Sequence, residues 1–244
     1  MKTQPLLFGA MFAAVFLIKP VAAADLGPGL LYKSPPPIGE DWNPWMIRAR
    51  AIGVLPSTSG SSVNVVGVPA LSSPSSSLAI GSRVLPEFDI SYFFNRNFAT
   101  EVILGVIPQR ITGTGTLANL DVGRVWLLAP TAMFQYHFTD FGPLKPYIGI
   151  GATYTDFFRQ SAGNVANNGI AVTSLSVNNS FGVGAQIGFD YMLDRHWGLN
   201  VDLKKFYLEP GYSAIATTGP FDFPVHGTAH MNPWLLGGGV AYKL

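Results

Sequence analysis

The chain has 244 residues, of which 12% are charged and 13% aromatic, and its 15 basic side chains almost balance its 14 acidic ones. This balance gives no support to nucleic-acid binding, which usually needs a basic face, and the lack of cysteine excludes disulfides. Beyond the N-terminal segment no apolar run approaches the roughly 20 residues of a transmembrane helix. Few charges, many aromatics and 27 glycines therefore favour a membrane β-barrel.

Residues 1–24 are predicted to be a secretory signal peptide. Lys2 supplies the basic start, residues 6–18 the apolar run, and residues 22–24 the small residues of a cleavage site. The apolar run is too short to cross a bilayer core of about 30 Å. We therefore expect export, with residues 25–44 as a periplasmic segment and residues 45–244 as the barrel.

Eight later segments alternate between apolar and polar residues over the length that a tilted strand needs to cross a membrane. In chain order they are residues 45–55, 83–94, 98–108, 125–138, 146–158, 180–193, 197–207 and about 229–244. The sixth alternates most regularly, with Phe181, Val183 and Ala185 on one face and glycines between them. The eighth keeps its alternation up to the final residue, which is typical of a strand whose outer face is covered by lipid.

The connections between these segments alternate in length. Those after the first, third, fifth and seventh are long and polar, as in residues 56–82 and 160–179, and are predicted to be loops. The others are only a few residues long. Short periplasmic turns and long outer loops are typical of bacterial outer-membrane barrels, and an even strand number leaves both termini in the periplasm.

The predicted fold is all-β: an eight-stranded antiparallel transmembrane β-barrel with short periplasmic turns and long extracellular loops. The alternative is a soluble barrel of the lipocalin type, which would have a polar outside and an apolar lumen. Here the continuously apolar face opposes one that carries Glu, Asp, Arg and Asn, so we expect lipid outside and polar groups within.

The inward positions near the periplasmic end carry charges of both signs on neighbouring strands. They are Arg48, Arg50, Glu87, Asp89, Glu101, Asp190, Asp202 and Lys204. The interior of an eight-stranded barrel is barely wide enough for its own side chains, and a buried carboxylate is costly without a partner. We therefore predict that these groups pair and fill the lower barrel as a charge plug.

Toward the outer end the predicted inward side chains become apolar. They are Ile52, Val54, Leu85, Ile107, Leu127, Phe157 and Phe206. Above a polar plug they would form a pocket for an oily ligand, although they could also simply pack against one another. With the plug closed, a solute would leave sideways between strands near Pro86, Pro108, Pro130 and Pro233, because proline donates no ladder hydrogen bond.

The sequence contains no convincing catalytic or metal-binding pattern. A Gly-x-Ser-x-Gly elbow is missing, and His137 is expected to be a lumen or interface residue. His226 and His230 have the spacing of paired ligands on a helix, but they fall in a loop or strand start. We expect no enzymatic activity, no metal and no cofactor. A plugged structural barrel, or a surface receptor whose long loops recognise a ligand, is the alternative to a channel.

Several short motifs occur in a fixed order along the chain. They are residues 47–51 (IRARA), 86–94 (PEFDISYFF), 129–131 (APT), 135–138 (QYHF), 146–158 (PYIGIGATYTDFF), 188–191 (GFDY) and 232–235 (NPWL). Together they resemble the OmpW family of small outer-membrane barrels over nearly all of the mature chain. Two differences are Ala129 where the family usually has a second proline and Leu244 where it usually ends on phenylalanine.

The resemblance implies an outer-membrane location and a narrow hydrophobic channel for uptake or passage of small hydrophobic molecules. It also implies contact with outer-membrane lipid and insertion by the barrel-assembly machinery, for which the terminal residue matters. The identity of the solute and the oligomeric state are left open.

Overall fold

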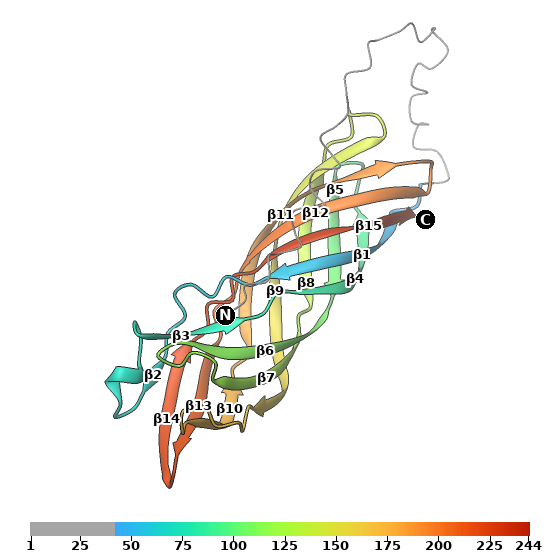
Figure 1. The fold of residues 1–244 in the computed structure, drawn as a ribbon. Helices are drawn as coiled ribbons and strands as arrows, with labels where there is room; N and C mark the ends of the chain where they lie inside the picture. Colours follow the sequence, from blue (N-terminus) through green and yellow to red (C-terminus); the bar gives the residue numbers. More distant parts are fainter. Residues whose placement is uncertain (1–41) are drawn as a thin grey trace, which may run out of the picture. The chain divides into compact units, whose positions relative to one another are not determined.

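The computed structural model describes residues 42–244, so the predicted signal peptide and nearly all of the predicted periplasmic segment lie outside the described residues. Eight antiparallel strands close into a barrel, in which each strand pairs with the next and the last pairs with the first (Figure 1). They are β1 (Trp45–Leu55), β4 (Arg83–Phe93), β5 (Phe98–Leu104), β8 (Thr131–His137), β9 (Leu144–Ala162), β11 (Ser180–Met192), β12 (Trp197–Tyr207) and β15 (Trp234–Lys243). The predicted eight-stranded barrel is confirmed.

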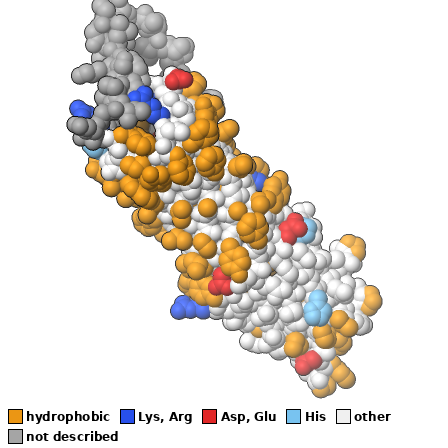
Figure 2. All heavy atoms as spheres, turned by 180° about the vertical axis from the view of Figure 1, so that it is seen from behind, with side chains coloured by type: hydrophobic (Ala, Val, Ile, Leu, Met, Phe, Trp, Pro, Cys, Tyr) orange, Lys and Arg blue, Asp and Glu red, His pale blue; other side chains and the backbone are white. Residues whose placement is uncertain are grey.

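Strand alternation determines which side chains face out. Phe88, Ile150 and Ile187 are 65%, 69% and 59% exposed, whereas Glu87 and Asp89, on either side of Phe88 in β4, are buried. Figure 2 shows hydrophobic side chains gathered over the barrel with few charges among them. A lipocalin-type barrel has the opposite arrangement, so the soluble alternative is wrong.

The predicted third and fourth segments, residues 98–108 and 125–138, were wrong as single strands. Each breaks in two: β5 is followed by β6 (Val106–Gly115), and β7 (Asp121–Leu128) is followed by β8. The breaks fall at Gly105 and at Ala129–Pro130, where a glycine weakens the strand and a proline cannot donate a ladder hydrogen bond. Beyond the breaks β6 pairs with β7, and β7 pairs with the outer end of β9.

This change of partner leaves part of the barrel wall unpaired. β4 pairs with β1 along its length, from Arg83 to Tyr92, but with β5 only from Phe88 to Phe93. Residues 83–87 therefore have a ladder partner on the β1 side alone. We call the opening in the barrel wall between residues 83–87 of β4 and the break at Gly105 the wall gap.

The predicted loops 56–82 and 160–179 were wrong in part, because they contain strands. They contain β2 (Asn64–Val65), β3 (Ser76–Ile80) and β10 (Ala171–Val177), with a short 3-10 turn at Pro69–Leu71, and the connection after β12 contains β13 (Gly211–Thr218) and β14 (Phe221–Thr228). β3 extends the barrel sheet through β6, while β10, β13, β14 and β2 form a second sheet. Apolar residues such as Val63, Val65 and Leu78 are buried between them.

We call β2, β3, β6, β7, β10, β13 and β14 together the head. Figure 1 places these strands at the end of the barrel opposite the C-terminus. Within residues 42–244 no helix is long and apolar enough to cross a bilayer.

Two periplasmic turns are held by the same kind of side-chain hydrogen bond. Asn95 Oδ1 accepts hydrogen bonds from the backbone N–H groups of Asn97 and Phe98, both at 2.9 Å. Asp194 Oδ1 accepts them from His196 and Trp197, both at 2.7 Å. The N–H groups of Trp197 and His196 hold the pKa of the Asp194 carboxyl below its usual range.

Asp194→Ala should therefore lower the urea midpoint of unfolding at neutral pH, whereas Asp194→Asn should retain most of the stability because its amide oxygen can accept the same bonds. A carboxyl group whose pKa is lowered by folding stabilises the folded protein at pH values above its ordinary pKa of about 4. This stabilisation is lost as the pH falls through the lowered pKa. The difference between wild type and Asp194→Ala should thus shrink in acid. Urea titrations at pH 7 and pH 3 measure this, and an undiminished difference at pH 3 would contradict it.

Candidate functional site

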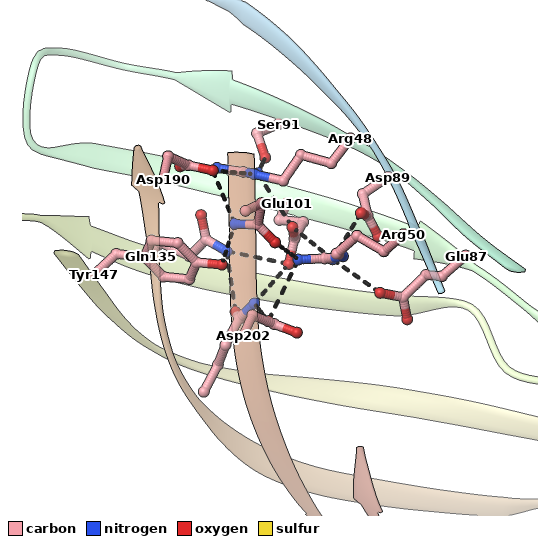
Figure 3. Close-up of polar contacts among 12 residues, drawn as sticks. Arg48, Arg50, Glu87, Asp89, Ser91, Glu101, Gln135, Tyr147, Asp190 and Asp202 are labelled. Carbon is pink, nitrogen blue, oxygen red and sulfur yellow. Dashed lines mark hydrogen bonds and ion pairs between the residues drawn. The ribbon is translucent and has the colours of Figure 1, made fainter. Parts of the chain in front are cut away.

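The eight charged residues of the predicted plug come together inside the barrel. They lie on β1 (Arg48, Arg50), β4 (Glu87, Asp89), β5 (Glu101), β11 (Asp190) and β12 (Asp202, Lys204), and each is less than 5% exposed. Their spacing of two residues within a strand turns both members of each pair inward. We keep the name charge plug for these eight residues, most of which are labelled in Figure 3.

Arg48 is held by two carboxylates and a hydroxyl. Its Nε and Nη2 donate to the two carboxylate oxygens of Asp190 at 3.0 and 2.7 Å. Its Nη1 donates to Ser91 Oγ at 2.6 Å and to Glu101 Oε1 at 3.2 Å. The bidentate pair fixes the guanidinium plane, because two parallel bonds leave it little rotational freedom.

Arg50 lies among four carboxylates. Its Nη2 is 2.9 Å from Glu87, 2.6 Å from Asp89 and 3.1 Å from Glu101, and its Nη1 is 3.4 Å from Asp202. Lys204 Nζ lies 3.1 Å from Glu87 and 2.9 Å from Asp202. The three basic groups therefore share five carboxyl groups, and every basic group contacts at least two of them.

Uncharged polar side chains complete this network, and the prediction of the plug did not include them. Gln135 Nε2 donates to Glu101 at 3.1 Å, and Gln186 Nε2 donates to Glu101 at 3.0 Å and to Asp202. Asn200 Nδ2 donates to Tyr147 Oη at 3.0 Å and to Asp190 at 2.8 Å. These residues occupy inward-facing positions in the alternating pattern of β8, β9, β11 and β12. That alternation could have identified them, whereas a search for charged residues could not.

A cavity of about 80 Å³, the inner cavity, lies directly above the plug, with Glu87 and Lys204 in its lining. Six of the seven predicted ligand residues line it: Ile52, Val54, Leu85, Ile107, Leu127 and Phe206. The seventh, Phe157, lies in the wall of the next cavity outward, because β9 continues past the barrel into the head.

The inner cavity reaches the wall gap. Pro86, Gly105, Val106 and Ala129 line it, and Val106 is also 49% exposed on the outer surface. The same residues thus border the cavity and the outside of the barrel, at the height where β4 lacks a partner on one side.

Two further apolar cavities continue from the inner cavity through the head. The neck, of only about 10 Å³, shares Gln109 and Met231 with the inner cavity. The outer cavity, of about 330 Å³, shares Leu78, Val122 and Tyr212 with the neck. Except for a few polar groups their linings are aliphatic and aromatic, so the three cavities follow one another as an apolar series from the head to the plug.

The family model described as the OmpW family matches residues 44–244. The chain belongs to the OmpW family. It is 40% identical over 234 residues to the uncharacterized outer-membrane protein y4mB of Sinorhizobium fredii, and this alignment covers 96% of this chain and 94% of that protein. It is 30% identical to outer membrane protein W of Vibrio cholerae over 79% of this chain and 84% of the relative.

A crystal structure supports the same fold for this OmpW-family chain. The outer membrane protein OprG from Pseudomonas aeruginosa superposes with a TM-score of 0.67 at 23% identity, over 82% of this chain and 95% of that chain. The relatives are named outer-membrane proteins and the fold is an outer-membrane β-barrel. The OmpW-family protein described here is therefore a protein of the bacterial outer membrane.

The histidines of this OmpW-family barrel do not form a metal centre. Among residues 42–244 no group of three or more His, Cys, Asp or Glu side chains is placed to hold a metal ion. His137 is buried, with its Nε2 3.0 Å from Gln135 Oε1. His226 lies on β14 and His230 follows that strand, so their spacing does not bring them together as it would on a helix.

Proposed function

We propose that this barrel takes up small hydrophobic molecules from outside the cell and releases them sideways into the outer membrane. The observation that carries the proposal is the apolar series of cavities, which runs from the head to the wall gap and ends above a charged floor. Membership of the OmpW family supports an outer-membrane barrel as the setting.

A straight passage to the periplasm is disfavoured by the charge plug. The eight side chains are buried and joined by ion pairs, and an apolar solute passing between them would have to separate charges that have no water to replace their partners. The interior of an eight-stranded barrel leaves little room beside them. A hydrophobic solute in the inner cavity therefore has a lower barrier toward the wall than toward the floor.

The wall gap offers such a route. Residues 83–87 of β4 have no ladder hydrogen bonds toward β5, and Pro86 has no N–H to donate. Widening the gap consequently breaks few backbone hydrogen bonds. A solute that leaves here enters the lipid that covers the apolar outer face of the barrel.

The neck must open for a solute to pass, since about 10 Å³ has room for no more than one water molecule. Met231 is shared by the neck and the inner cavity. Methionine is unbranched and flexible, so it can change rotamer without breaking a hydrogen bond. Passage through the neck should therefore depend on side-chain movement rather than on rearrangement of a strand.

Uptake of a labelled alkane by cells that produce the protein tests the proposal, with Val54→Phe as the decisive variant. Val54 is 4% exposed and lines the inner cavity, so a phenylalanine there should fill it. We expect uptake to fall about fivefold, equivalent to about 1 kcal/mol in the barrier. The control is Val183→Phe, which makes the same change at an outward-facing position that is 53% exposed.

Equal uptake by Val54→Phe, Val183→Phe and wild type would favour the packed structural barrel instead. Because the control adds the same bulk and the same apolar surface, a difference between the two variants reports the cavity rather than expression or insertion. Heat-modifiable migration of both variants on gels verifies that each has folded.

A further inference from the structure

Two buried polar side chains in the inner cavity lack hydrogen-bond partners among the residues that the structure describes. They are Gln109, through Oε1, and Thr155, through Oγ1. Gln109 is 3% exposed and Thr155 is 1% exposed, and both line the inner cavity. A buried polar group without a partner retains its full desolvation cost. In a mostly apolar lining, such groups are typical of a site that receives a polar atom of a ligand.

Thr155 differs from the two threonines beside it. Thr131 and Thr153 pair across β8 and β9 and also line the cavity, but each hydroxyl already donates to a carbonyl: Thr131 to Ala129 O at 3.1 Å and Thr153 to Pro130 O at 3.3 Å. Thr155 has no such acceptor. Its hydroxyl can therefore both donate to and accept from a ligand oxygen.

Gln109 lines the same cavity where it meets the neck. It is the polar residue shared by the inner cavity and the neck, so a molecule that passes between them moves along its side chain. Its unpartnered Oε1 is an acceptor and needs a donor from the ligand. A hydroxyl satisfies both Gln109 and Thr155, whereas a hydrocarbon satisfies neither.

The charge plug determines which oxygen group is tolerated. Glu87 and Lys204 line the cavity floor, and Lys204 already contacts Glu87 and Asp202. The plug contains five carboxyl groups for three basic ones, and each basic group contacts at least two carboxylates. A ligand carboxylate would find no basic group of the plug free and would face an excess of acidic groups. A neutral hydroxyl avoids this repulsion.

We propose that the inner cavity is a binding site for alcohols, that is, for an apolar chain or ring that carries a hydroxyl group. The hydroxyl pairs with Thr155 and Gln109, and the apolar part packs against Ile52, Val54 and Phe206. This assignment rests on the proposed function and names its substrate class.

Titration of methyl-labelled protein in lipid nanodiscs with decane, 1-decanol and decanoate tests the assignment, with the methyl signals of Val54 and Leu127 as local reporters. We expect 1-decanol to bind about fivefold more tightly than decane, as one net neutral hydrogen bond provides, and decanoate to bind more weakly than 1-decanol. Thr155→Val should reduce 1-decanol to the affinity of decane and leave decane unchanged. Gln109→Leu, made separately, should also weaken 1-decanol selectively.

The matched control is Thr173→Val, which removes an exposed hydroxyl in the head that bonds to Thr217, and it should leave all three affinities unchanged. Equal binding of decane and 1-decanol, with no effect of Thr155→Val or Gln109→Leu, would overturn the alcohol site and leave uptake of hydrophobic molecules intact. Tightest binding of decanoate would also overturn it. No shift with any of the three compounds would overturn both proposals.

Discussion

Replacing Arg50 with methionine should lower the free energy of unfolding by about 3–5 kcal/mol, because it removes one partner of a buried charge network. Arg50 contacts Glu87, Asp89, Glu101 and Asp202, and its side chain is fully buried. Lys204 and Arg48 still contact three of these carboxyl groups, but Asp89 has no other basic partner in the described network. The variant therefore leaves a carboxyl group buried without compensation.

Urea unfolding in lipid vesicles, followed by tryptophan fluorescence and gel migration, measures this loss. The control is Arg110→Met, the same substitution at a half-exposed arginine that pairs with Asp121 at 2.7 Å. An exposed ion pair of this kind contributes about 0–1 kcal/mol. If both variants lost equally little stability, the plug would not hold the barrel together as its geometry indicates.

Gly105→Phe should reduce uptake of a hydrophobic solute about tenfold, equivalent to about 1.4 kcal/mol in the barrier to release. Gly105 lines the inner cavity at the wall gap, and a Cβ atom built on it meets nothing within 4 Å. The ring can therefore occupy the gap without disturbing the backbone. Since the charge plug forms the floor of the same cavity, a closed gap leaves the solute no low-barrier exit.

Two variants separate closure of the gap from other effects. Gly105→Ala should keep near-normal uptake, because a methyl group is too small to fill the opening. Gly81→Phe places the same ring at a position in the β3–β4 connection where a Cβ also meets nothing within 4 Å and which lines none of the three cavities. Uptake by Gly105→Phe equal to that of Gly81→Phe would argue against sideways release, even if Val54→Phe blocked transport.

The barrel could be predicted from the sequence because its strands alternate strictly between lipid and lumen. That period of two places Arg48 with Arg50 and Glu87 with Asp89 on one face, so membership of the plug followed from parity and charge together. The uncharged partners Gln186 and Asn200 obey the same parity. Their role depends on which strands meet across the barrel, and this is not visible along one strand.

The head could not be predicted in the same way. One of its strands, β2, has only two residues, and its partner is far away in the chain: Asn64 and Val65 of β2 pair with His226 and Val225 of β14. Such pairing has no local signal, because the buried face of a two-residue strand is completed by other segments. The wall gap was missed for a related reason. Alternation continues across Gly105, although the partner of the strand changes there.

The charge plug also constrains how the protein enters the membrane. Its ion pairs join strands far apart in sequence, as between Arg48 of β1 and Asp190 of β11 or between Glu87 of β4 and Lys204 of β12. A β1–β4 hairpin inserted alone would keep the contacts of Arg50 with Glu87 and Asp89, but it would carry Arg48 into lipid without its carboxylate partners on β5 and β11, at a cost of several kcal/mol. Stepwise threading of hairpins is therefore disfavoured, and the sheet has to curl into a nearly closed cylinder before or while it crosses the bilayer.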